Sequence, residues 1–397
     1  MKFEFVEEHQ RYQAKIKVIG IGGAGGNAIN NMIASKLRGV EFIVANTDSQ
    51  DLERSECPFR IQLGASITKG LGAGADPEIG KLSAEESISE IREAVEGADM
   101  VFLTAGMGGG TGTGASPIFA KECKQSGALT VAVVTKPFKF EGEKRMKRAL
   151  SGIEALKKEV DTLIVIPNER LKSVGSKACT FKELIAKADE VLLQAVRGIS
   201  DLIMSSGFIN LDFADVKKVM EQMGTAMMGT GRASGEKRAA EAAQLAVSSP
   251  LLEDISICGA KGLLMNITGP SDMTMDEIDE ASTYIKQEVH PDAEIFWGVV
   301  FDDSLGDEVQ VTVIATGIES ERNQPVAKIR DLRPDGLEEG WTVKRGEEIL
   351  DVPTYKRVGK DLEDPYARGR RDKRGIFDQD FFEDELDYPT FLRVKAD

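Results

Sequence analysis

Two glycine-rich segments are candidates for binding phosphate groups. The first is GIGGAGGN at residues 20–27, and the second is GMGGGTGTG at residues 106–114. Each lies between an apolar run and a helical pattern, as expected for a turn that joins a strand to a helix. Backbone N–H groups at such a turn bind anions, helped by the positive end of the helix dipole. Two of these turns facing one crevice would cradle a chain of phosphates, with hydroxyl groups added by Thr111 and Thr113.

Neither segment contains a lysine, so backbone N–H groups and a metal ion would have to neutralise the phosphates. The pattern GxxxxGK[ST] is absent from the sequence, which argues against a P-loop NTPase. Residues 20–25 do fit the dinucleotide pattern GxGxxG, with Glu41 and Asp48 as acidic residues further along. A nicotinamide-dependent oxidoreductase is therefore an alternative. The second glycine segment argues against it, and His9 and His290 are the only histidines available as its catalytic base.

A third segment, NLDFAD at residues 210–215, offers acidic and amide side chains for hydrolysis. Asp212, Asp215 and Asn210 are suited to polarising a water molecule and holding a cation. The same letters are also typical of a helix start, with Asp212 as the N-cap of a helix that begins at Phe213. Both roles are compatible with one aspartate.

The composition is typical of a soluble globular protein, and the length indicates two domains or one large domain with appendages. The chain has 397 residues and a net charge of −16, which argues against nucleic acid or an anionic membrane surface as its main partner. No apolar run approaches the ~20 residues of a membrane span, and the first residues lack a signal-peptide pattern. We therefore expect a cytoplasmic protein without direct membrane insertion. The four cysteines show no CxxC spacing and are expected to be reduced.

Alternating strand and helix patterns predict the elements that carry the glycine segments. The predicted strands cover 15–20, 40–46, 100–106, 129–135 and 161–168, and the predicted helices cover 27–37, 77–96, 116–127 and 143–158. Strands that are apolar on both faces, each followed by a helix, indicate a parallel sheet covered by helices on both sides.

A long amphipathic pattern at 181–207 predicts a helix buried on more than one side, as expected between two domains. The second half then alternates again. Its predicted helices cover 213–223, 235–247 and 274–288, and its predicted strands cover 262–268, 293–301 and 308–317. These elements indicate a smaller α+β domain.

The chain changes character after Gly317. Dense mixed charge up to about residue 380 predicts a disordered linker, and its basic clusters are better explained by solvation than by lipid contact. The last stretch, FFEDELDYPTFLRVKAD, restores aromatic residues. An apolar island at the end of a charged tail is typical of a peptide that docks on partners. A strand that packs back on the body is the alternative.

Seven segments in the same order give the chain a resemblance to a known family. They are GGAGGNA, NTDSQDL, GLGAGADPEIG, AGMGGGTGTGASP, PFKFEGEKR, NLDFADVKKVM and ELDYPTFLRVKAD. The chain resembles the FtsZ family, bacterial relatives of tubulin that polymerise with GTP. The resemblance runs from about Lys15 to Gly317 and resumes at the C-terminal peptide.

The resemblance implies an α/β fold with a parallel-sheet GTP-binding domain, tubulin-like and Rossmann-related. A long central helix would join this domain to a smaller α+β domain, and a disordered C-terminal tail would follow. The expected bounds are 1–14 for a flexible extension, 15–180 for the GTP-binding domain, 181–206 for the central helix, 207–318 for the α+β domain, 319–380 for the linker and 381–397 for the partner-binding peptide.

The resemblance also implies which residues contact GTP or GDP. Those around the phosphates and sugar would be Gly22, Gly23, Ala24, Gly26, Asn27, Asn46, Asp48, Gly72, Ala73, Gly74, Gly108, Gly109, Gly110, Thr111, Gly112, Thr113, Gly114, Glu141, Arg145 and Asn168. Asp189 would read the donor edge of guanine, although without the resemblance it is better interpreted as a solvated helix residue. The family often has an aromatic ring where Ile185 stands, so the packing on guanine differs here.

In the family, the segment with Asn210, Asp212 and Asp215 inserts into the nucleotide pocket of the next subunit. The resemblance therefore implies a GTPase whose site is completed by head-to-tail assembly into filaments, with Mg²⁺ on the phosphates and K⁺ left open. It also implies that the C-terminal peptide binds membrane-tethering and regulatory proteins at the division site, on the inner face of the membrane. The alternative is a GTP-binding structural filament protein with little hydrolysis.

Overall fold

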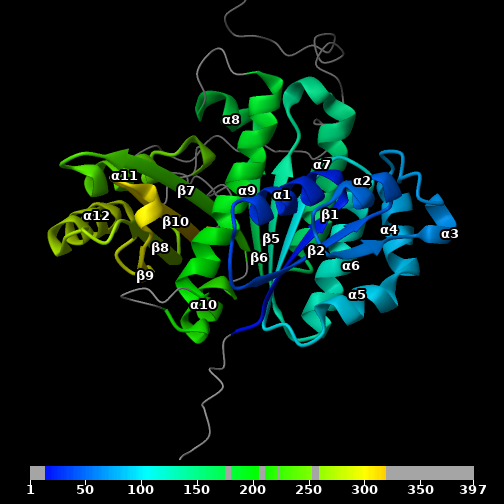
Figure 1. The fold of residues 1–397 in the computed structure, drawn as a ribbon, viewed down its shortest axis with the longest axis horizontal. Helices are drawn as coiled ribbons and strands as arrows, with labels where there is room; N and C mark the ends of the chain where they lie inside the picture. The colour runs from blue at the N-terminus through cyan, green and yellow to red at the C-terminus, as the bar shows by residue number, and fades with distance from the viewer. Residues whose placement is uncertain (1–13, 175–179, 205–210, 222–223, 253–258, 319–397) are drawn as a thin grey trace, which may run out of the picture. The chain divides into compact units, whose positions relative to one another are not determined.

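One continuous sheet organises the chain (Figure 1). The computed structural model describes residues 14–174, 180–204, 211–221, 224–252 and 259–318. The strands are β1 (Ile16–Ile21), β2 (Val40–Asn46), β3 (Phe59–Gln62), β4 (Met100–Gly106), β5 (Leu129–Lys136), β6 (Thr162–Pro167), β7 (Gly224–Ser234), β8 (Gly262–Gly269), β9 (Glu294–Phe301) and β10 (Glu308–Ile318). They lie in the order β3-β2-β1-β4-β5-β6-β7-β10-β8-β9. All pairs are parallel except those made by β10, so the predicted mostly parallel α/β fold is confirmed.

Three short helices, at 49–54, 65–68 and 168–174, have no counterpart in the sequence prediction, and the others lie within or overlap predicted helices. The helices are α1 (Gly22–Ala34), α2 (Ser49–Arg54), α3 (Ala65–Thr68), α4 (Pro77–Glu86), α5 (Ile88–Val95), α6 (Thr111–Gln125), α7 (Glu143–Lys157), α8 (Asn168–Val174), α9 (Phe181–Met204), α10 (Phe213–Met220), α11 (Arg238–Val247) and α12 (Met275–Glu288). None of them, within the described part of the chain, is long and apolar enough to cross a membrane.

Successive residues of the central strands point into different cores. Val18 and Phe102 face the core shared with α1 and α9, while Ile19 and Leu103 face the core shared with α6 and α7. Burial on both faces explains why these strands are continuous apolar runs rather than alternating ones. A third core lies between β7–β10 and the helices α11 and α12.

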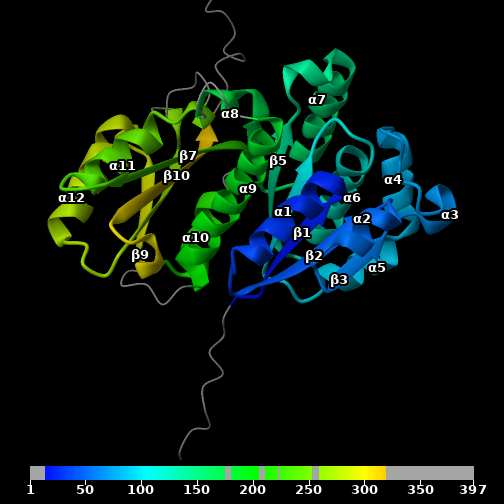
Figure 2. The same ribbon diagram turned by 45° about the horizontal axis from the view of Figure 1, so that its top comes forward.

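Helix α9 lies between the half of the sheet formed by β1–β6 and the half formed by β7–β10 (Figure 2). Its Ile199 shares a core with Phe102 of β4 and with Ile314 of β10. Gly198 allows the close approach on the second side, because a Cβ there would lie 2.9 Å from Cγ2 of Thr312. The prediction of a helix buried on more than one side is confirmed.

Several predicted element bounds differ from the structure. The helix predicted at 77–96 is two helices that meet at Ser87. The helix predicted to begin at residue 116 begins at Thr111, so the end of the second glycine segment is its first turn. In the same way α1 begins at Gly22 rather than at residue 27. Strand β7 has no counterpart in the prediction, and it joins the two halves through three residue pairs with β6.

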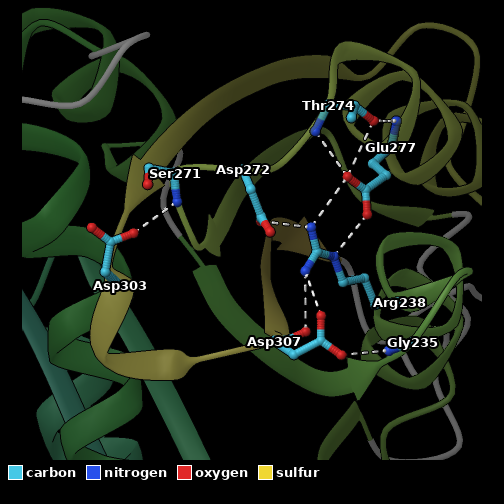
Figure 3. Close-up of polar contacts among 8 residues, drawn as sticks. All are labelled: Gly235, Arg238, Ser271, Asp272, Thr274, Glu277, Asp303 and Asp307. Atoms are coloured by element: carbon cyan, nitrogen blue, oxygen red, sulfur yellow. Dashed lines mark hydrogen bonds and ion pairs between the residues drawn. The ribbon is translucent and has the colours of Figure 1, made fainter.

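A charged cluster fastens the end of the sheet that carries α11 and α12 (Figure 3). The buried guanidinium of Arg238 bonds to three carboxylates from separate segments: Glu277 Oε1 at 2.7 Å, Asp307 Oδ1 at 2.8 Å and Asp272 Oδ1 at 2.9 Å. Glu277 also completes a capping box with Thr274 at the start of α12. The cluster thus joins the first residue of α11 to α12 and to the turn before β10.

The two glycine segments and helix α10 lie at opposite edges of the parallel strands. The loops after β1, β4, β5 and β6 all lie at the carboxyl edge, since neighbouring strands are parallel. The C-terminal end of α10 lies at the amino edge, where Thr162 at the start of β6 donates a hydrogen bond from Oγ1 to the Met220 carbonyl. Between them α9 runs 24 residues, or about 36 Å at 1.5 Å per residue. Figure 1 shows α8 and α10 at opposite ends of α9.

Candidate functional site

The two glycine segments lie side by side at the carboxyl edge. Gly22 has a φ of +73°, and a Cβ there would lie 3.0 Å from the main-chain nitrogen of Gly112. A Cβ on Gly106 would lie 2.6 Å from that of Ala24. Because the segments follow the paired strands β1 and β4, the N-termini of α1 and α6 are brought together. The arrangement concentrates unpaired backbone N–H groups and two positive dipole ends at one place.

The glycines of the second segment serve two different purposes. At Gly114 a Cβ would collide with the carbonyl oxygen of Pro77, and at Gly110 it would lie 2.8 Å from Cβ of Ala73. These glycines let α6 and the loop before α4 pack closely. Gly109 is different, because nothing lies within 4 Å of a Cβ there. The space beside Gly109 is open to a ligand.

The hydroxyl groups of both threonines in the second segment form hydrogen bonds with other residues of the chain. The side-chain oxygens of Thr111 and Thr47 lie 2.6 Å apart. Oγ1 of Thr113 accepts a hydrogen bond from the Gly108 N–H at 2.8 Å. Both hydroxyls therefore shape the turn, in addition to any contact they make with a ligand.

The segment after β2 forms a second wall of the site. Asn46 is buried, and its amide lies 3.3 Å from Oδ2 of Asp51. Asp48 is the N-cap of α2, with Oδ1 accepting from the Gln50 N–H at 2.9 Å. Asn46 and Asp48, two of the predicted contacts, are thus held by local hydrogen bonds.

The loop at residues 72–75 closes over the second segment. Gly72, Gly74 and Ala75 have φ values of +85°, +57° and +61°, a conformation that glycine adopts easily and alanine does not. Ala73 is buried against Gly110. The loop is consequently fitted to the edge of the glycine turn.

Helix α7 and the turn before it contribute charges. Arg145 Nε lies 3.1 Å from Oε2 of Glu141. The other carboxylate oxygen of Glu141 accepts from the Phe138 N–H at 2.8 Å. The backbone of Arg145 lies directly against Gly108, where a Cβ would be 2.8 Å from the Arg145 carbonyl oxygen.

Asn168 and Asp189 have side-chain oxygens without a hydrogen-bond partner within the described residues. Asn168, the first residue of α8, is buried with no hydrogen bond to its Oδ1. Asp189 on α9 is half-buried, and burial raises the pKa of its carboxyl to about 6. Groups of this kind are suited to a ligand that donates hydrogen bonds.

The predicted catalytic residues lie elsewhere. Asp212 is exposed at the amino edge and caps α10, its Oδ1 accepting from the Asp215 N–H at 2.9 Å. Asn210 lies outside the described residues. The structure therefore packs the two glycine segments, Ala73 and Arg145 against one another and leaves the two aspartates at the far end of α9.

Three sets of contacts at the site are not predicted by the sequence motifs. Thr47 pairs with Thr111, and Arg148 donates a hydrogen bond to the Ala75 carbonyl. Phe140 stacks on Phe138 and contacts Phe181 of α9 edge to face, with ring centroids 5.2 and 5.9 Å apart. No sequence pattern indicates these contacts. The contacts of Thr47, Arg148 and Phe181 join segments that are distant along the chain, and Phe140 is one aromatic residue in an otherwise charged stretch.

Comparison with known proteins identifies close relatives. Residues 15–176 match the model of the Tubulin/FtsZ family GTPase domain, and residues 224–319 match that of the FtsZ family C-terminal domain. Cell division protein FtsZ of Magnetospirillum gryphiswaldense is 56% identical over 312 residues, which are 79% of this chain and 56% of that protein. Cell division protein FtsZ of Coxiella burnetii is 51% identical over 384 residues, 96% of either chain.

The match spans only about half the length of the relatives from Magnetospirillum gryphiswaldense and Bartonella bacilliformis. Among solved structures, the FtsZ dimer of M. jannaschii superposes with a TM-score of 0.75 at 46% identity. That superposition covers 78% of this chain and 90% of the other.

Proposed function

The chain belongs to the FtsZ family, and from that membership we propose that it is a GTP-dependent polymerising protein of cell division. It binds GTP at the carboxyl edge, assembles head to tail and hydrolyses GTP between adjacent subunits. The observation that carries the proposal is the separation of the two aspartates from the glycine turns by the length of α9.

Nucleotide binding is supported by the chemistry of the carboxyl edge. The paired N-termini of α1 and α6 supply backbone donors for phosphates, and the space beside Gly109 leaves room for them. An ionised Asp189 carboxylate matches the N1–H and N2–H₂ donors of guanine. The unpaired Oδ1 of Asn168 is an acceptor for a base or sugar donor. These residues fit a guanine nucleotide.

We also propose Mg²⁺ as the cation bound with the nucleotide. Mg²⁺ is usually held by substrate phosphates with one or two carboxylates, and it supplies charge neutralisation for phosphoryl transfer. The glycine segments contain no lysine to do this. Whether K⁺ is needed as well is left to the experiment below.

Hydrolysis would require the aspartates of a neighbour. Within one chain, Asp212 and Asp215 lie at the opposite edge from the proposed nucleotide site. Asn210 is proposed as a third hydrolytic residue because the chain belongs to the family. Joining the amino edge of one subunit to the carboxyl edge of the next brings the two halves together. Such a contact is heterologous and generates open filaments rather than closed dimers.

The first test is phosphate release from GTP as a function of protein concentration, with Mg²⁺ and with either K⁺ or Na⁺. A shared site predicts negligible release at low concentration and a steep rise above a threshold. Release proportional to protein from the lowest concentration would show that each chain carries a complete site. No release at any concentration would leave a nucleotide-binding scaffold.

A mixing experiment tests the shared site directly. Asp212→Asn removes the acid but leaves the nucleotide edge intact, and Asp189→Ala weakens nucleotide binding but leaves Asp212 in place. A shared site predicts that the mixture hydrolyses more GTP than the sum of the two variants alone. Purely additive activity contradicts the proposal.

The C-terminal peptide, about Asp387 to Lys395, is proposed to bind membrane-tethering and regulatory division proteins. It lies outside the described residues, and its support is the similarity of ELDYPTFLRVKAD to the family's terminal peptide. This would place the protein at the division site on the inner face of the membrane. Deleting residues 381–397 should abolish recruitment to the division site while GTP hydrolysis in solution is retained, whereas unchanged recruitment would contradict the role.

A further inference from the structure

Arg148 links two segments of the carboxyl edge that are far apart in the sequence. Its Nη1 donates a hydrogen bond to the main-chain oxygen of Ala75. Ala75 is the last residue of the loop at 72–75, which leads through the N-cap Asp76 into α4. The contact therefore ties α7 to this loop.

The loop has few other attachments. The Gly72 N–H donates to the Thr47 carbonyl at 3.2 Å, and the Asp76 N–H donates to the Ala73 carbonyl at 3.0 Å. Between them, within the described residues, the bond from Arg148 is the one hydrogen bond that residues 74 and 75 make. Ala75 also has a left-handed φ of +61°, a strained conformation for a residue with a Cβ. Arg148 thus helps to hold a strained segment.

The same face of α7 packs along the second glycine segment. A Cβ on Gly108 would lie 2.8 Å from Cγ of Arg145, and a Cβ on Gly152 would collide with Cγ2 of Thr113. Residues 145, 148 and 152 share one side of the helix because they are three and four positions apart. Arg148 consequently lies between the glycine turn and the loop at 72–75.

The charge of Arg148 is not neutralised by the described residues. No carboxylate pairs with it there, and its buried Nε has no hydrogen-bond partner. Arg145, one turn earlier, has Glu141 at 3.1 Å. Leaving a buried donor unpaired is unfavourable, and an anion bound nearby would offset that cost.

We propose that Arg148 is a positioning residue for the terminal phosphate of the nucleotide, an inference that rests on the proposed function. By holding the Ala75 carbonyl it keeps the loop at 72–75 closed over the phosphate end of the site. Its unpaired charge adds to the attraction for the more highly charged triphosphate. Arg148 therefore favours GTP over GDP.

The test compares the affinities of the full chain for GDP and for a slowly hydrolysed GTP analogue, below the concentration at which it assembles. Arg148→Gln should weaken binding of the analogue about tenfold more than binding of GDP, the effect of losing one charge-assisted interaction. Arg148→Lys should restore part of the difference, since it keeps the charge but not the fork geometry. Lys147→Gln, the exposed neighbour on α7, makes the same charge change and should leave the ratio of affinities as it is.

Equal weakening of both nucleotides by Arg148→Gln, or no weakening of either, would overturn the inference, because a purely structural role does not discriminate between them. Thermal unfolding of each variant separates such a loss from misfolding. If the unsubstituted chain binds neither nucleotide, the proposed function itself fails. If it binds both and Arg148→Gln keeps their ratio, only the role of Arg148 fails.

Discussion

The hydroxyl oxygens of Thr47 and Thr111 lie 2.6 Å apart in the buried junction between the segment after β2 and the first turn of α6. The carbonyl of Thr47 in turn accepts from the Thr68 hydroxyl and from the Gly72 N–H, both at 3.2 Å. One buried threonine therefore ties together three segments that meet at the proposed phosphate end of the site.

Replacing Thr47 by valine should lower the free energy of unfolding by about 1–3 kcal/mol, because the buried Thr111 hydroxyl loses its partner. Urea unfolding measures the change. The double variant Thr47→Val with Thr111→Val should recover part of the loss, since both partners are then apolar. The explanation would be contradicted if the double variant lost more unfolding free energy than the two single variants lose together.

Two glycines of the same segment should respond differently to alanine. Gly114→Ala forces a Cβ against the Pro77 carbonyl, so we expect a loss of roughly 1–3 kcal/mol in unfolding free energy. Gly109→Ala meets no protein atom within 4 Å and should unfold like the unsubstituted chain. Its methyl group would nevertheless enter the space proposed for the phosphates, so it should weaken GDP binding about tenfold, the size of one displaced hydrogen bond to a charged group. Normal GDP binding by Gly109→Ala would remove Gly109 from the site.

Asp212→Asn should abolish most GTP turnover without unfolding the chain. Asparagine retains an oxygen that caps α10, so stability should be unaffected, while the loss of the acid should reduce turnover about 10²-fold. GDP binding should be unchanged, because Asp212 lies at the opposite edge of the sheet. Glu221→Gln, which removes a charge at the end of the same helix, is the matched control. Comparable losses in both variants would argue for a general charge effect.

GDP affinity should fall on acidification. Burial raises the pKa of Asp189 to about 6, so below that pH the carboxyl is neutral and no longer accepts from guanine. Between about pH 7.5 and about pH 5 the affinity should drop about tenfold. Asp189→Asn should bind GDP weakly with little dependence on pH.

Asp201 titrates in the same range, since burial raises its pKa also to about 6. The comparison with Asp189→Asn, rather than the pH profile alone, therefore assigns the loss of GDP affinity to Asp189.

In the free protein the raised pKa of Asp189 makes the stability of the fold depend on pH in the opposite direction. Stability falls as pH rises from the ordinary aspartate value of 3.8 through about 6, because the charged form is disfavoured in the folded state.

The cluster around Arg238 should make stability depend on pH in the other direction. The hydrogen bond from Arg238 holds the pKa of Glu277 below its ordinary value of 4.5. A depressed carboxyl pKa contributes stability above that value, and the contribution is lost as pH falls through the folded-state pKa. Arg238→Met should cost roughly 2–4 kcal/mol near neutral pH and remove most of this acid dependence. Lys237→Met, at the exposed neighbouring position, should change neither.

The central strands and the glycine turns were predictable because each rests on a local pattern. Burial on both faces makes β1, β4 and β5 continuous apolar runs, and glycine is required where Gly22 turns with positive φ. Strand β7 was not predictable in the same way. Its GTAMMGTGRAS contains three glycines, which weaken any strand pattern. Two of them are there because α11 packs so closely that a Cβ on Gly229 or Gly231 would meet its backbone.

The candidate site was predictable only as far as its motifs reach. The glycine segments and the acidic segment are visible in the sequence, but their separation depends on the path of α9 and on the packing of α10. The partners of Thr111 and of Ala75 are set by tertiary contacts between distant segments. Domain bounds and the residues proposed to contact GTP remain predictions.

The placement of Asp212 at one edge and the glycine turns at the other determines how many complete hydrolytic sites a filament holds. Under the proposed assembly, an open filament always holds one complete hydrolytic site fewer than it has chains. The terminal chain at one end keeps its nucleotide without an acid, and the one at the other end presents an acid without a nucleotide. Turnover per chain would then rise with filament length, so a factor that severs filaments would slow hydrolysis without touching any residue of the site.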